Sequence, residues 1–163
     1  MRCCSALLPW PRMSDILVPI SAGELLDKLT ILRIKSRRMQ DAAKLANVRR
    51  ELEALERTCE RALGAPLVQL GSTGKLAAEI AALEQVNAAL WDIEDRIRDH
   101  EAAGRFDADF IQLARAVYLR NDERAAIKRR INLALGSSLI EEKSYRPYGA
   151  ASGTAPGTDG PAR

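Results

Sequence analysis

The sequence has few aromatic residues, few cysteines and one histidine, and each scarcity excludes a class of site. Aromatic residues make up 4% of the 163 residues, too few for a surface that stacks nucleic-acid bases. Cys3, Cys4 and Cys59 form no Cys-x-x-Cys pair, and His100 is the only histidine. Structural zinc needs about four such ligands, so we predict no metal and no cofactor. This cysteine usage is typical of a reducing compartment, which predicts a cytoplasmic protein.

Long apolar runs are also missing. The longest uncharged stretch, residues 62–74, contains Gly, Pro and Gln and is shorter than the roughly 18 apolar residues of a membrane span. The apolar run that ends at Pro9 is shorter than the about 7–15 residues of a secretory signal. We therefore predict neither a membrane partner nor a signal peptide. Residues 1–13 are expected to be a flexible or non-native extension, with Met13 as the candidate initiator.

The middle of the chain differs in composition from its end. Residues 146–163 are rich in Gly, Ala, Pro, Ser and Thr and have no apolar period, which predicts a disordered tail. Leu, Ala, Arg, Glu and Ile dominate the rest, so residues 14–145 are expected to form a single helical domain. A β-branched run over 16–20 contains Pro19 and predicts either a lone edge strand or an extended lead-in.

Apolar spacing predicts the helices of this domain. A Ser-x-x-Glu capping box at Ser21 precedes a helix over 22–40. Its apolar side chains occupy two faces, so it lies either at the centre of the bundle or at an oligomer interface. A heptad stripe over 45–63 and a longer stripe over 72–104 predict two more helices.

Residues 108–135 leave two possibilities open. They form either one continuous helix or two helices divided at Asn121 and Asp122, with Asp107 as the N-cap in both cases. The expected fold class is all-α: an antiparallel helical bundle with coiled-coil-like packing and a short extended N-terminal lead-in.

Charge is unevenly distributed along the helices. Residues 22–64 and 105–136 each carry a net charge of +3, whereas residues 72–103 carry −4. One interpretation is that the acidic helix screens its basic neighbours within the bundle or across a dimer. The alternative is an anion-binding site, because like charges repeated on one helix face repel one another and favour a counter-ion. Its candidate residues are Lys35, Arg120, Arg124 and Lys128.

Polar residues interrupt the long apolar stripe one heptad apart, at Asn87 and Glu94. Polar side chains at such positions commonly fix register and partner number, and we predict that role for both, with a catalytic Glu94 as the alternative. Asp92, Asp95 and Asp99 share the opposite face, where we expect water or a basic helix. His100 is expected at the surface, and no side chain stands in a pattern for nucleophilic catalysis.

Three blocks of the sequence resemble a family of small bacterial proteins of unknown function. They are ILVPISAGELLDKLTILRIK near the N-terminus, LWDIEDRI in the middle, and NDERAAIKRRIN followed by EEKSY near the C-terminus. The resemblance covers most of residues 13–145 and implies that both ends are additions, but it implies no activity, cofactor or site. The blocks contain polar residues that packing does not require: Asp27, Lys28, Lys35, Asn121, Asp122, Arg124, Lys128 and Asn132. One interpretation is that they cap a helix or form pairs such as Glu24–Lys28. The alternative is that they gather around a small anion.

The sequence therefore predicts a non-enzymatic cytoplasmic module that acts through protein contacts, as a homodimer or with another protein. The alternative is a binding module or enzyme for a small phosphorylated or carboxylated metabolite. Nucleic-acid binding is less favoured, because no continuous basic stripe with interleaved aromatic residues is present.

Overall fold

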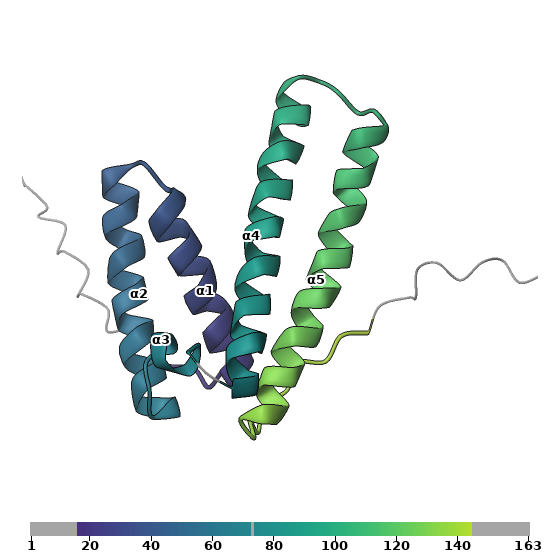
Figure 1. Cartoon of the computed structure of the whole chain (residues 1–163). Helices are drawn as coiled ribbons and strands as arrows, with labels where there is room; N and C mark the ends of the chain where they lie inside the picture. The colour runs from purple at the N-terminus through teal and green to yellow at the C-terminus, as the bar shows by residue number, and fades with distance from the viewer. Residues whose placement is uncertain (1–15, 73, 145–163) are drawn as a thin grey trace, which may run out of the picture.

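A computed structural model describes residues 16–72 and 74–144 of the chain, and this part is helical throughout its regular structure. It confirms the expected all-α antiparallel bundle (Figure 1). The helices are α1 (Ala22–Arg38), α2 (Ala42–Leu63), α3 (Leu67–Leu70), α4 (Gly74–Ala102) and α5 (Ala108–Ala134). Residues 16–20 form an extended lead-in without regular structure. The predicted extension over 1–13 and tail over 146–163 lie outside the described residues.

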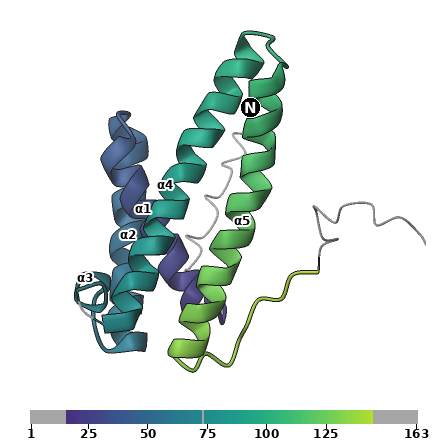
Figure 2. The same ribbon diagram turned by 45° about the vertical axis from the view of Figure 1, so that its right-hand side comes forward.

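The helices form two antiparallel hairpins that meet around α1. One hairpin is α1 with α2, and the other is α4 with α5; α1 contacts both α4 and α5 as well as α2. The two views agree that the α4/α5 hairpin extends beyond the α1/α2 hairpin (Figures 1 and 2). The two apolar faces of α1 are thus covered within the chain, which places this helix at the centre of the bundle.

Local sequence explains where the helices begin and end. The Ser21 hydroxyl accepts a hydrogen bond from the Glu24 backbone N–H (3.2 Å), and the Asp107 carboxylate accepts one from the Phe110 N–H (3.1 Å), as N-caps do. α2 ends at Gly64, whose φ of 75° is the left-handed conformation that glycine adopts without strain.

α5 is one continuous helix, so Asn121 and Asp122 do not divide it. The Asn121 side-chain amide donates to the Val117 carbonyl (3.0 Å) within the same helix. An Asn bonded in this way leaves the backbone ladder intact, and no cap forms at this position.

The apolar core lies where α1 crosses the bases of the other helices. Buried leucines of α1 pack against α2, α3, α4 and α5 through the cluster Leu25, Leu26, Leu29, Cys59, Leu67, Ile80, Leu83, Val86, Ile127 and Ile131. The short helix α3, which the sequence did not predict, inserts the fully buried Leu67 under this cluster. The core is therefore concentrated at one end of the molecule.

α1 begins in very close contact with α5 because residue 23 is a glycine. The Gly23 N–H donates to the Asn132 side-chain oxygen at 2.6 Å. A Cβ atom at position 23 would lie 2.6 Å from the Lys128 carbonyl oxygen and 2.9 Å from that Asn132 oxygen. Neither contact is compatible with a normal van der Waals separation, so the approach of the two helices requires glycine here.

We expect Gly23→Ala to destabilise the protein by about 1–3 kcal/mol, the usual cost of overpacking, as measured by urea unfolding. An ordinary helical Gly→Ala change has the opposite sign and stabilises by about 0.5–1 kcal/mol. A variant more stable than the wild type would contradict the close approach of α1 and α5.

Candidate functional site

The most distinctive polar feature is a carboxylate buried among the core leucines. Asp27 on α1 is 1% exposed. Its Oδ1 accepts a hydrogen bond from Arg124 Nε at 2.9 Å, and Arg124 Nη2 bonds its Oδ2, so the α5 guanidinium grips both oxygens. The bonds to Asp27 outweigh the effect of burial and raise the pKa of Arg124 above its usual range. The guanidinium is therefore a permanent counter-charge for this carboxylate.

Asn87 connects the same carboxylate to α4. Its side-chain amide donates to Asp27 Oδ1 (2.8 Å) and to the Thr30 hydroxyl (3.0 Å), and that hydroxyl donates to the Asp27 carbonyl (2.8 Å). Every buried side-chain nitrogen and oxygen in the described part of the chain has a partner. The network thus joins α1, α4 and α5, each of which contributes at least one residue. All of its buried hydrogen-bonding atoms have partners within the protein.

A second ionic cluster lies at the base of the bundle. Lys128 is 8% exposed and its ammonium lies 2.7 Å from Glu24 and 2.5 Å from Glu141. Burial alone would lower the pKa of Lys128, but the hydrogen bonds to the two carboxylates outweigh it and raise the pKa. The hydrogen bond from Lys128 in turn lowers the pKa of Glu141. This cluster attaches the segment after α5 to the start of α1.

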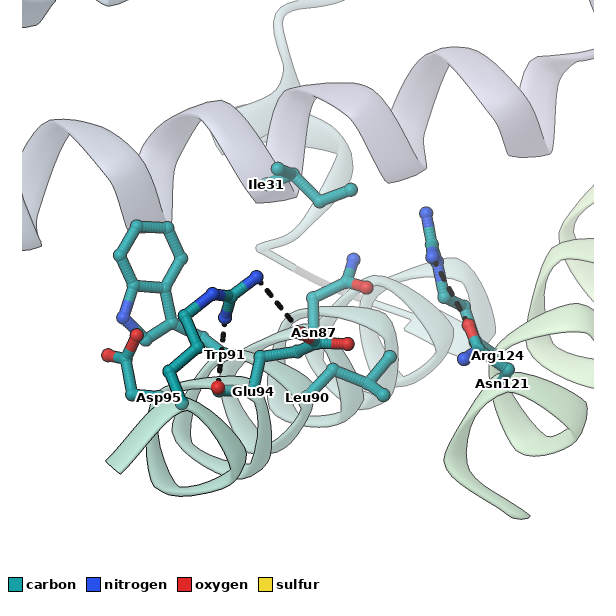
Figure 3. A pocket seen from close by; sticks show the side chains of 9 residues that line it. Ile31, Asn87, Leu90, Trp91, Glu94, Asp95, Asn121 and Arg124 are labelled. Atoms are coloured by element: carbon teal, nitrogen blue, oxygen red, sulfur yellow. Dashed lines mark hydrogen bonds and ion pairs between the residues drawn. The ribbon is translucent and has the colours of Figure 1, made fainter. Parts of the chain in front are cut away.

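Arg124 lies between two open grooves. The larger, of about 560 Å³, runs between α1 and the α4/α5 hairpin. Figure 3 shows Ile31 of α1 opposite Leu90 and Trp91 of α4, with Arg124 at one end. Its lining residues are Ile31, Asn87, Leu90, Trp91, Glu94, Asp95, Arg98, Asn121 and Arg124. The smaller, of about 320 Å³, lies on the other side of Arg124 and is lined by α1, α2 and α5.

The four predicted anion-binding residues do not form one site. Lys35 and Arg124 both line the smaller groove. Arg120 is exposed and pairs with Glu123 on its own helix (2.6 Å), and Lys128 is enclosed by its two carboxylates. The regular spacing on α5 correctly places three cations on one face, but α1 and the segment after α5 supply carboxylates for two of them.

The polar residues of the resembling blocks are gathered only in part. Asp27, Lys28, Lys35 and Arg124 line the smaller groove, and Asn121 lines the larger one with Arg124. Lys28 pairs with Glu51 of α2 (3.1 Å), so the expected Glu24–Lys28 pair is wrong. Glu24 pairs instead with the buried Lys128. Asn132 is fully buried, and its side-chain oxygen accepts the hydrogen bond from the Gly23 N–H at the start of α1.

Two further predictions need correction. Glu94 is not a buried seam residue: its side chain is 45% exposed and pairs with Arg98 (3.1 Å), because α5 and α1 leave this side of α4 open. His100 is 7% exposed, since it packs beside Phe110 at the hairpin tip. Asn87, by contrast, is buried as expected, although its partners are Asp27 and Thr30 within the same chain.

The described residues contain no group of three or more His, Cys, Asp or Glu placed to hold a metal ion. Burial raises the pKa of the Cys59 thiol, which disfavours the reactive thiolate. Asp27 is occupied by its own partners. Arg124 and Lys35 both line the smaller groove. The described residues contain no ion-pair partner for the Lys35 ammonium.

Sequence reasoning missed the partners more than the members of this network. Thr30 and Glu141 are not predicted from the sequence, and Glu24 is predicted to pair with Lys28 instead of Lys128. A usable signal was present: Asp27 and Thr30 stand among the apolar positions of a helix that is apolar on two faces. A short polar side chain at such a position must be buried and hence hydrogen-bonded.

No family model, curated protein or solved structure matches this chain. None of the helices in the described ranges is both long enough and apolar enough to cross a membrane. The resemblance to a family of small bacterial proteins stays a prediction.

We expect Arg124→Leu to destabilise the protein by about 3–5 kcal/mol, because it leaves Asp27 as a buried carboxylate without its counter-charge. Arg120→Leu, one turn away on the same helix, removes only an exposed pair and should change the unfolding free energy by less than about 0.5 kcal/mol. Urea unfolding of both variants provides the comparison. Equal effects would show that Arg124 is no more structural than Arg120.

Proposed function

We propose that this protein is a non-enzymatic cytoplasmic interaction module that forms homodimers. The supporting observation is the unequal length of the two hairpins. Within residues 16–72 and 74–144, α4 and α5 pack only against each other beyond the end of α1 (Figure 1). Large apolar side chains on this part of the hairpin remain open to solvent, including Phe106 at 59%, Ile111 at 53% and Leu119 at 43% exposure. We infer that these side chains contribute to a protein contact.

The polar network supports the same conclusion. A catalytic site requires groups that can exchange protons or bind substrate, whereas Asp27, Asn87 and Lys128 are saturated by partners in their own chain. Their role in this proposal is to hold two hairpins in a fixed relation, which is what a binding surface built from both requires.

Sedimentation equilibrium of the full chain over a range from low to high micromolar concentration tests the proposal. We expect a reversible monomer–dimer equilibrium. A strictly monomeric species over the whole range would contradict homodimer formation.

A second candidate function is the binding of a small anionic metabolite, and Lys35 is the observation that favours it. Its ammonium has no carboxylate at ion-pair distance in the described part of the chain, yet it lines a groove together with Lys28 and Arg124. Cations converging on a groove favour phosphate or carboxylate groups. Asp27, Glu24 and Glu51 line the same groove and oppose a highly charged ligand, so we rank this function second.

Thermal unfolding in the presence of inorganic phosphate, pyrophosphate or citrate tests this candidate. Binding in the groove predicts a rise in Tm that Lys35→Ala removes. Lys44→Ala changes an exposed lysine of α2 that does not line the groove, and it should leave the rise unchanged. No rise with any of the three anions, or the same rise in Lys35→Ala, would contradict it.

A further inference from the structure

The acidic face of α4 is only partly covered by the basic end of α1. Arg37 bonds Glu84, and Arg38 bonds Asp92. α1 ends at Arg38, but the acidic face continues along α4 through Asp95 and Asp99, both of which are exposed. Neither of these two has an ion-pair partner among residues 16–72 and 74–144. α1 therefore neutralises the first part of the acidic face and leaves the rest open.

Three arginines without a carboxylate partner in the described ranges lie on the outer face of α2. Arg50, Arg57 and Arg61 share this face, opposite the buried Val48 and Cys59. Arg50 bonds Asn47 and Arg61 bonds Thr58, but no carboxylate in the described ranges pairs with any of the three arginines. This contrasts with α1 and α5, where most arginines have a carboxylate partner. The α2 face is thus a basic surface without an internal counter-charge.

Apolar side chains accompany both charged surfaces. Ile16 and Leu17 of the lead-in are 77% and 91% exposed and border a hollow of about 700 Å³ together with the three α2 arginines. On the other surface, Asp95 forms the rim of the 560 Å³ groove, whose apolar lining is Ile31, Leu90 and Trp91 (Figure 3). Each surface therefore combines apolar area with charge. The charge is mainly basic on α2, where Glu51 also lines the hollow, and mixed in the α4 groove, where Arg98 and Arg124 accompany Glu94 and Asp95.

The two surfaces cannot meet within one chain. α1 lies between α2 and α4, and the outer face of α2 points away from the α4/α5 hairpin (Figure 1). A basic surface that faces Asp95 and Asp99 would therefore have to come from another molecule, and a second copy of this chain carries one on α2.

We propose that the homodimer forms by docking of α2 of one copy onto the uncovered acidic face of α4 of the other. Arg57 and Arg61 are one helical turn apart, and so are Asp95 and Asp99, so both pairs can meet across two antiparallel or parallel helices. Ile16 and Leu17 bring apolar area to the groove beside Asp95. Under a two-fold axis the contact occurs twice, once in each direction. This inference rests on the proposed homodimer and names its surface.

Charge reversal on each side tests the docking. Variant one carries Arg57→Glu with Arg61→Glu, and variant two carries Asp95→Arg with Asp99→Arg. Each alone should raise the dimer dissociation constant at least tenfold, because like charges then face each other. An equimolar mixture of the two, and a chain carrying all four changes, should recover dimers in sedimentation equilibrium, because both restore opposite charges. Wild-type dimers should also weaken as salt is added.

Lys75→Glu with Arg129→Glu is the matched control, since it changes the net charge as much as variant one but lies at the start of α4 and the end of α5, where neither residue lines the groove or the α2 hollow. It should keep the wild-type dissociation constant, and circular dichroism checks that every variant is folded. If the wild type dimerises and both charge-reversed variants dimerise equally well, the α2–α4 surface is wrong while the homodimer stands. If the charge-reversed variants lose dimers but neither the mixture nor the fourfold variant recovers them, the pairing of these two surfaces is also overturned. A monomeric wild type would overturn the homodimer itself.

Discussion

The fold depends on supplying partners for one carboxylate buried inside an apolar core. Asp27 lies between leucines that are fully buried, where an unpaired carboxylate would cost several kcal/mol. Arg124 supplies the counter-charge from α5 and Asn87 supplies a further donor from α4. Because these partners belong to different helices, the carboxylate is satisfied in only one relative placement of α1, α4 and α5. Leucines alone would permit several placements of similar energy.

The same constraint explains the shape of the molecule. The polar network and the close approach at Gly23 hold the two hairpins together around α1. Past the end of α1, no element in the described part of the chain connects them, so the longer hairpin stands apart (Figures 1 and 2). Asp95 and Asp99 on its α4 are exposed. The proposed dimer uses this arrangement, with attachment at one end of the hairpin and uncovered surface at the other. The arrangement also leaves charges of opposite sign unmatched on α2 and α4.

Much of the fold could be predicted from the sequence, because the information is local. Caps at Ser21 and Asp107 and the apolar stripes set the helices to within a few residues. The long-range partners could not be predicted, because they lie on other helices. Lys28 pairs with Glu51 of α2, and Glu24 pairs with Lys128 of α5. The i,i+4 rule that suggested Glu24–Lys28 describes an isolated helix, whereas a buried cation competes more strongly for the same carboxylate.

For the candidate site too, positions on a helix could be predicted, but partners on other helices could not. The spacing of Arg120, Arg124 and Lys128 correctly indicates one helix face, but only the fold reveals that Arg124 meets a buried carboxylate and that Arg120 meets solvent. Asn87 was identified because a polar residue interrupts an apolar stripe, and it is buried; Glu94 has the same pattern and is half exposed. Periodicity places a residue on a face, but the length of the neighbouring helix decides whether that face is covered.

A double-mutant cycle between Asp27 and Arg124 tests the central claim most directly. Asp27→Leu and Arg124→Leu each leave one charge without its partner, whereas the double variant removes both charges. We predict that the double variant is less destabilised than the sum of the single variants by about 1–3 kcal/mol, as measured by urea unfolding. Additive effects, with a coupling energy near zero, would contradict the claim that this buried pair holds the helices together.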